Sequence, residues 1–145
     1  MLNIRDRANV SIKLFDQYGK LKESREIRNL VTTAGKNHIA DQLSSSPSGA
    51  AMSHMAIGIG ISAAVVGDTA LQTELDRNAL TSRTDSGNVV TYVGDWAAGD
   101  GTGAVTEAGI LNAASSGTLL ARTVFTVINK AALDTLQITW TLTLG

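Results

Sequence analysis

The stretch that decides the fold is 136-LQITWTLTL-144, close to the C-terminal end of the printed sequence. Every second residue from Leu136 to Leu144 is apolar, and each residue between them is glutamine or threonine. Successive side chains of a β-strand point to opposite faces, so this period of two predicts a strand with one buried and one polar face. We therefore expect the segment to be built into a sheet.

Working outward, the same kind of pattern predicts further strands joined by turns rich in glycine, asparagine, aspartate and serine. The expected strands are residues 9–15, 20–30, 54–60, 89–93, 105–111 and 118–128, of which the first two form a hairpin. A helix is expected over residues 33–43, capped by Thr32 or Thr33. Residues 68–75 fit either a short helix or an extended loop.

These elements predict a mainly β fold, an antiparallel β-sandwich or barrel of about seven or eight strands with one or two short helices. We expect one β-rich domain over residues 1–145. Within it, residues 1–31 form an N-terminal arm and hairpin, residues 32–49 a helix and loop, and residues 50–145 the core β region.

Composition excludes several classes of function. The net charge is -1, from 12 Lys+Arg against 13 Asp+Glu, so there is no basic excess for nucleic acid. The absence of cysteine removes disulfides, thiolate metal sites and cysteine nucleophiles. No apolar run approaches the roughly 20 residues of a membrane span, and the polar N-terminus lacks a signal core. We expect a protein made in a cytoplasm, with neither nucleic acid nor membrane as partner.

Two glycine-rich stretches suggest ligand loops but do not complete them. In 58-GIG-60, the third glycine of a dinucleotide loop is replaced by Ala63, and no clear helix follows. In 99-GDGTG-103, one aspartate with Asp95 and Glu107 nearby falls short of a calcium ligand set. A glycine-rich turn is the interpretation that we favour for the second stretch.

The remaining candidates for chemistry have no supporting spacing. His38 and His54 are the two histidines, and neither stands in a metal-ligand or triad pattern. None of the serines lies in a Gly-x-Ser-x-Gly elbow. We therefore expect no catalytic residue, no cofactor and no metal, and a protein that is not an enzyme.

A glutamate and an arginine stand among apolar residues in the last third of the chain, at Glu107 and Arg122. A buried charge is costly unless it is paired, so each needs a partner. Glu107 is expected to pair with Arg122 or with Arg77, as a structural ion pair rather than a catalytic one. The expected faces are Glu107 with Val105, Gly109 and Leu111, and Arg122 with Leu120, Val124 and Ile128.

Four short motifs carry a resemblance to a known group of proteins. They are 56-AIGIG-60, 69-TALQTELDR-77, 107-EAGI-110 and 117-GTLLAR-122. In this order, followed by the alternating last strand, they resemble small virion proteins of tailed bacteriophages. Both capsid decoration (cement) proteins and the N-terminal domains of tail-collar fibre proteins share the likeness. It covers about two thirds of the chain, from Met55 to Gly145.

The resemblance implies a structural virion protein on the capsid surface that binds the phage major capsid protein and stabilises its lattice. It also implies a homo-oligomer, with a trimer as the expected state. Collar fibres continue into a long fibrous region, whereas this sequence stops at Gly145, which favours a decoration protein. The alternatives are a tail, collar or baseplate fibre-attachment protein and, less favoured, a carbohydrate-binding module. The last would need exposed aromatic residues, which make up only 4% of the chain.

The N-terminus offers a candidate docking arm. Arg5, Asp6 and Arg7 precede the first alternating strand. Such an arm is either a frayed end or a segment that becomes ordered on a neighbouring subunit or on the particle. Our hypothesis is that residues 1–14 contribute to docking.

Overall fold

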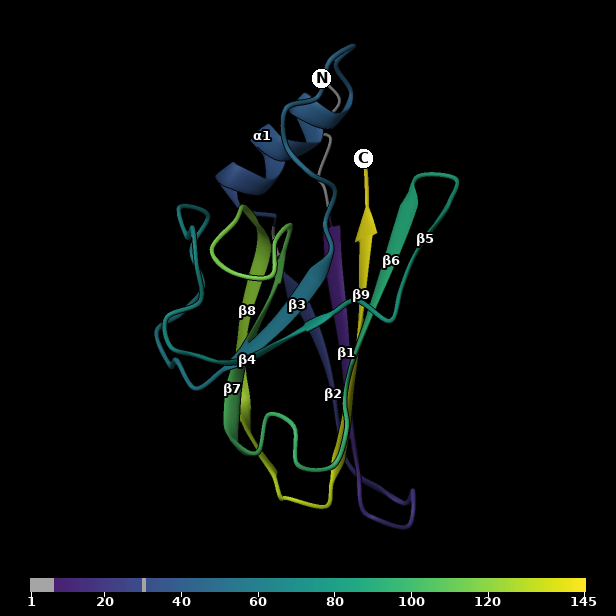
Figure 1. Ribbon diagram of the computed structural model, residues 1–145, viewed down its shortest axis with the longest axis vertical. Helices are drawn as coiled ribbons and strands as arrows, with labels where there is room; N and C mark the ends of the chain where they lie inside the picture. The colour runs from purple at the N-terminus through teal and green to yellow at the C-terminus, as the bar shows by residue number, and fades with distance from the viewer. Residues whose placement is uncertain (1–6, 30) are drawn as a thin grey trace.

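The computed structural model describes residues 7–29 and 31–145, which form two antiparallel sheets packed face to face (Figure 1). This confirms the predicted mainly β fold, in its sandwich form. The first sheet has the order β2 (Leu21–Asn29), β1 (Arg7–Phe15), β9 (Thr135–Thr143), β6 (Val89–Trp96), β5 (Ser82–Ser86). The second has the order β4 (Glu74–Ala79), β3 (His54–Gly58), β7 (Gly103–Leu111), β8 (Leu119–Lys130).

Strand β9, the most regular pattern in the sequence, is the central strand of the first sheet, between β1 and β6. Its apolar side chains from Leu136 to Leu142 are buried, and the alternate polar ones are half-buried on the outer face. The strand ends at Thr143, and Leu144, which continues the alternation, is 36% exposed.

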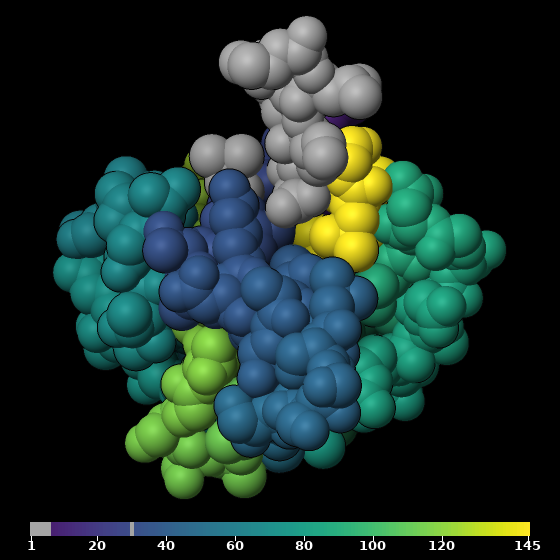
Figure 2. Space-filling model, turned by 90° about the horizontal axis from the view of Figure 1, so that it is seen from above, coloured from purple at the N-terminus to yellow at the C-terminus, as the bar shows by residue number. Residues whose placement is uncertain are grey.

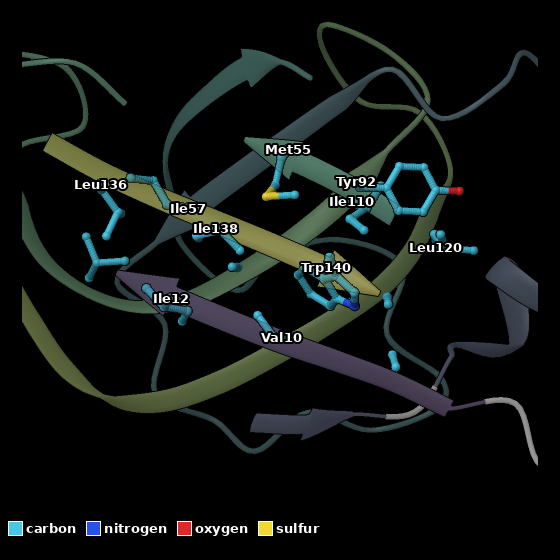
Figure 3. Close-up of a cluster of buried hydrophobic side chains, with 14 of the residues drawn as sticks. Val10, Ile12, Met55, Ile57, Tyr92, Ile110, Leu120, Leu136, Ile138 and Trp140 are labelled. Atoms are coloured by element: carbon cyan, nitrogen blue, oxygen red, sulfur yellow. The ribbon is translucent and has the colours of Figure 1, made fainter. Parts of the chain in front are cut away.

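The main core lies between the two sheets, as Figure 3 shows. Ile12 of β1 and Trp140 of β9 come from the first sheet, and Met55, Ile57 and Ile110 come from β3 and β7 of the second. Interior packing of this kind is the dominant stabilising contribution in a domain of this size.

Two strands, β4 and β5, were not predicted, so that the described residues hold nine strands rather than seven or eight. Both are edge strands with mostly polar side chains, and neither shows an apolar alternation. Polar residues on edge strands prevent unwanted pairing with other chains. That protection removes the signal by which such strands are recognised in a sequence.

The single helix of the described residues, α1 (Thr33–Gln42), packs on β8 at one end of the sandwich. Thr32 is its N-cap, and the Thr32 hydroxyl accepts a hydrogen bond from the amide of Gly35. Figure 2 looks onto this end and shows the helix lying across it. Strand β1 begins and β9 ends at this same end (Figure 1). None of the described helices is long and apolar enough to span a membrane.

The second sheet is covered on both faces. Its inner face packs on the first sheet, whereas its outer face carries a small cluster of Ala56, Leu111 and Leu119 beneath Leu71. Residues 59–73, which run from β3 to β4, pass over this outer face and bring Leu71 onto it. Residues 68–75 were expected to form either a short helix or an extended loop. In the structure they form an extended loop that leads into β4.

Two irregularities in the pairing of β7 with β8 correct the predicted faces. A register shift between Val105 and Glu107 leaves Val105 in the inner core and turns Glu107 to the outer face. A second shift, at Ile110/Leu111, leaves Leu120 in the inner core while Arg122 faces outward. The expectation that Glu107 shares a face with Val105, and Arg122 with Leu120 and Ile128, is therefore wrong, because each irregularity leaves unequal numbers of unpaired residues on the two strands and so changes the alternation of faces.

The position of β9 leads to a test of the fold. Ile138→Ala should lower the free energy of unfolding by about 2–5 kcal/mol, because it leaves a cavity at a fully buried site. Leu144→Ala is the matched control on the same face of the sequence pattern, and should cost about 0.5 kcal/mol or less. Urea titrations of both variants make the measurement. Equal losses would contradict the burial described for β9.

Candidate functional site

The candidate site is centred on Glu107, a fully buried carboxylate under residues 59–73. Its Oε1 atom accepts hydrogen bonds from the amides of Gly60 (2.9 Å) and Thr73 (2.7 Å). Its Oε2 atom accepts from the amide of Gln72 (2.9 Å) and from Nε of Arg122 (2.8 Å). Four donors therefore satisfy the two carboxylate oxygens and join both ends of the covering segment to one side chain.

Two glycines make room for this carboxylate. A Cβ atom on Gly58 would lie 2.5 Å from Oε1 of Glu107, and one on Gly60 would lie at the same distance. Both separations are far below van der Waals contact. The glycines of 58-GIG-60 therefore serve the approach of the Glu107 side chain to the backbone, rather than a phosphate group.

Arg122 is the partner of Glu107 and holds the middle of the same segment. Its guanidinium, 3% exposed, donates from Nη1 to Oδ2 of Asp68 (3.0 Å) and from Nη2 to the carbonyl of Ser62 (3.0 Å). Asp68 in turn accepts from the amide of Val65. A planar guanidinium can donate to several acceptors at once, and here its contacts with Ser62 and Asp68 hold residues 62–68 in place.

The charges of this pair are stabilised by their surroundings. Burial alone would raise the pKa of Glu107, but the hydrogen bonds from Thr73, Arg122, Gln72 and Gly60 outweigh it and hold the pKa below its ordinary value. Burial would lower the pKa of Arg122, but the bonds to Glu107 and Asp68 raise it above its ordinary value. A low-pKa carboxylate with four donors is suited to holding structure rather than to transferring a proton.

Arg77, the other expected partner, does not contact Glu107. It pairs with Glu74, with Nη2 to Oε1 at 2.6 Å, and donates from Nη1 to the carbonyls of Ala113 and Ser116. It thereby fixes the turn between β7 and β8. Of the two alternatives left open by the sequence, the structure places Arg122 beside Glu107.

A groove of about 790 Å³ opens beside this network, between β2 and β8. Its lining is mainly apolar and comprises residues 27–29, 32, 61, 63–66 and 122–124. One wall is the apolar run 61–66, in which Ile61, Val65 and Val66 are 78%, 60% and 53% exposed. The amide of Thr33 at the start of α1 donates to the carbonyl of Val66 and fastens this wall to the helix.

The remaining residues singled out in the sequence lie apart from this site. Arg7 is the exposed first residue of β1, and Arg5 and Asp6 lie outside the described residues. Residues 8–14 of the expected docking segment form an inner strand whose apolar side chains belong to the core, while Asn9 and Lys13 are exposed on its outer face. A docking role for this segment therefore stays a prediction, restricted to the outer face of β1.

The three acidic residues that were weighed as calcium ligands, and judged too few for a site, do not come together. Asp100 accepts a hydrogen bond from the side-chain Nδ2 of Asn78, and Asp95 accepts from the side chains of Thr81 and Gln137, while Glu107 belongs to the network above. Within residues 7–29 and 31–145, no three histidine or acidic side chains gather as metal ligands. Nearby, burial and the neighbouring Asp100 raise the pKa of Asp76.

Sequence reasoning did not identify Asp68 or the apolar wall 61–66 as parts of the site. The run 59-IGISAAVVG-67 has no regular alternation and is bounded by a glycine, so it favoured neither a helix nor a strand. An apolar run without periodicity, next to an acidic residue, is the one signal that could have marked this segment as an exposed apolar loop.

The chain matches no protein-family model, no curated protein and no solved structure.

The buried pair leads to a stability test. Glu107→Ala should lower the free energy of unfolding by about 3–5 kcal/mol, because Arg122 is left buried without its main partner. Glu74→Ala removes a partly exposed pair and should cost about 1 kcal/mol or less. Thermal and urea unfolding of both variants make the comparison, and a wild-type melting temperature for Glu107→Ala would contradict the network.

The glycines provide a second test in the same segment. Gly60→Ala should destabilise the protein by about 1–3 kcal/mol, because the new methyl group overlaps the Glu107 carboxylate and Cβ of Gln72. Gly67→Ala is the control, since nothing lies within 4 Å of its added Cβ. Urea unfolding that ranks the two variants in the opposite order would show that Gly60 does not serve Glu107.

The pKa direction gives a third prediction. Because the pKa of Glu107 is lower in the folded than in the unfolded state, its contribution is complete above its ordinary value of 4.5 and is lost as the pH falls further. The free energy of unfolding should therefore fall more steeply below about pH 5 in the wild type than in Glu107→Gln. Parallel urea titrations across the acid range measure both slopes, and equal slopes would refute the lowered pKa.

Proposed function

We propose that this protein is a structural virion protein of a tailed bacteriophage, a capsid decoration protein that binds the assembled major capsid lattice and stabilises it. Support comes from the four motifs that resemble such proteins. Their residues Gly58, Gly60, Glu107 and Arg122 meet in one network, and Glu74 and Arg77 of the same motifs fix the neighbouring turn. The resemblance thus rests on residues that act together.

The observation that carries the proposal is the apolar wall 61–66, held at the surface by buried charges. Exposed apolar patches of soluble proteins mark interaction sites. A surface that is already fixed before binding loses little conformational entropy on association. The arrangement fits a protein whose role is to bind another protein surface.

The mechanism of stabilisation is mass action. A protein that binds only the assembled lattice lowers its free energy by RT ln(1 + [L]/Kd) at each site. The same contribution recurs at every equivalent position of a symmetric shell. Modest affinity at each site therefore adds up to a marked resistance of the whole shell to disassembly.

Two alternatives have different expected observations. A tail, collar or baseplate attachment protein would use the same surface at low copy number, so counting copies on purified particles separates it from a decoration protein. A carbohydrate-binding module would need aromatic side chains at its surface for sugar stacking. The two tryptophans, Trp96 and Trp140, are buried in the core, and Tyr18, 85% exposed, is the one exposed aromatic side chain of the described residues. One isolated aromatic does not favour that alternative.

The proposal predicts that Ile61→Asp retains the fold but binds phage particles at least about tenfold more weakly, as expected for loss of an apolar anchor. Leu133→Asp, at an exposed position in the turn before β9, is the control and should bind like the wild type. Co-sedimentation with particles stripped of the protein measures binding, and quantitative mass spectrometry of native particles gives the copy number. Wild-type binding by Ile61→Asp would remove the apolar wall from the function.

A further inference from the structure

The edge strand β2 is paired on one side only. Among the described residues, β2 forms a ladder with β1 alone. Near the end of β2 the side chain of Asn29 donates to the carbonyl of Arg122 in β8, whereas residues 21–27 lie before this contact. A strand edge exposes a row of amides and carbonyls that can pair with another extended chain. The side chains along this edge therefore decide which chain can pair with it.

The sequence 21-LKESREI-27 is complementary to itself when a second copy runs antiparallel to it. With Ser24 of one copy opposite Ser24 of the other, every other position meets an opposite charge or a second apolar residue. The pairs between the copies are Glu23 with Arg25, Lys22 with Glu26 and Leu21 with Ile27, and each occurs twice. Opposite charges directly across two strands stabilise the pair. This register therefore places no like charges together.

A shift of the register by one residue in either direction removes this complementarity. Residues directly opposite in a sheet share a face, so a two-fold axis must pass through one residue of β2 and its copy. An axis at Glu23 sets two carboxylates against each other, and an axis at Arg25 sets two guanidinium groups together. Like charges directly opposite destabilise a strand pair. Ser24, which carries no charge, suits the position on the axis.

The charged groups of this segment are accessible in the single chain. The Arg25 guanidinium contacts Glu23 of its own strand at 3.2 Å, and the two side chains are 29% and 39% exposed. Lys22 contacts Asp134 at 2.8 Å and is 41% exposed, and its ammonium group can donate to more than one acceptor. Leu21 is an apolar side chain that is 48% exposed. Partly exposed ion pairs contribute little to stability, so these groups can contact a second copy at small cost.

We propose that two copies of this chain associate by antiparallel pairing of residues 21–27 of β2, which joins their first sheets into one continuous sheet. The contact is isologous, since both copies supply the same residues. Backbone hydrogen bonds between the strands provide the affinity, and the charge pairs fix the register. The inference goes beyond the proposed function, because it requires no phage particle. It predicts a dimer, whereas the trimer implied by the resemblance would need a different contact.

Charge reversal tests the pairing. Glu23→Arg alone and Arg25→Glu alone each set like charges opposite one another, so each variant should dimerise about tenfold more weakly than the wild type. An equimolar mixture of the two variants should dimerise about as tightly as the wild type, because one variant is positive and the other negative at the paired positions. Lys36→Glu, at an exposed position of α1, is the control and should leave dimerisation unchanged. Sedimentation equilibrium measures each dissociation constant.

The absence of cysteine allows the register to be checked by disulfide trapping. In Ser24→Cys the two thiols lie opposite each other, with Cα atoms about 4.5–5.5 Å apart, which a disulfide can span. Arg28→Cys lies on the same exposed face of β2, but in this register it is about 27 Å from its copy. On oxidation, Ser24→Cys should form a disulfide-linked dimer at least about tenfold faster than Arg28→Cys. Non-reducing electrophoresis follows both reactions.

Three results would overturn the inference. The first is a wild-type chain that stays monomeric at about 100 μM, a concentration that populates even a weak dimer. The second is a mixture of the two charge variants that dimerises no better than either variant alone. The third is a disulfide that forms as fast in Arg28→Cys as in Ser24→Cys. Circular dichroism verifies that each variant is folded. Because these experiments use the purified protein alone, they can fail while particle binding succeeds, and the reverse.

Discussion

The ion pair between Glu107 and Arg122 is the interaction on which the surface of this protein depends. A sandwich of two sheets needs no charge in its interior, and taking two ions out of water costs free energy that their attraction must offset. Here the cost is offset by hydrogen bonds, since four donors meet Glu107 and the guanidinium of Arg122 reaches three acceptors. The bonds go to backbone groups of residues 60–73 and to Asp68, so the pair specifies the path of a long loop that has no ladder of its own.

From this constraint follow the other features of the site. The loop covers the outer face of the second sheet, and Leu71 shields the small cluster there from water. Glycine is required at positions 58 and 60, because the carboxylate occupies the space of their side chains. The apolar residues 61–66 cannot turn inward, since their two ends are bound through Ser62 and Asp68. They stand exposed beside the groove, in a position to contact a partner.

How far the sequence predicts this arrangement depends on whether a feature leaves a periodic signal. Strand β9 could be recognised because half-burial imposes an alternation of two, and helix α1 because Thr32 is a suitable cap. Strands β4 and β5 could not be recognised, because strands at exposed edges carry polar residues without an apolar alternation. The need of Glu107 for a partner follows from the cost of a buried charge, but the choice of Arg122 over Arg77 depends on two bulges that no local pattern announces. The backbone donors at Gly60, Gln72 and Thr73 are likewise invisible, because every residue but proline has an amide.

The central claim is that one buried carboxylate holds the covering loop, and amide hydrogen exchange tests it most directly. The amides of Gly60, Gln72 and Thr73 donate to Glu107, so in the wild type they should exchange about as slowly as those of β9. In Glu107→Gln these three amides should lose protection together, while the amides of Ile138 and Trp140 in β9 remain the slowest in the chain. Fast exchange of the three amides in the wild type, or unchanged protection in Glu107→Gln, would contradict the account.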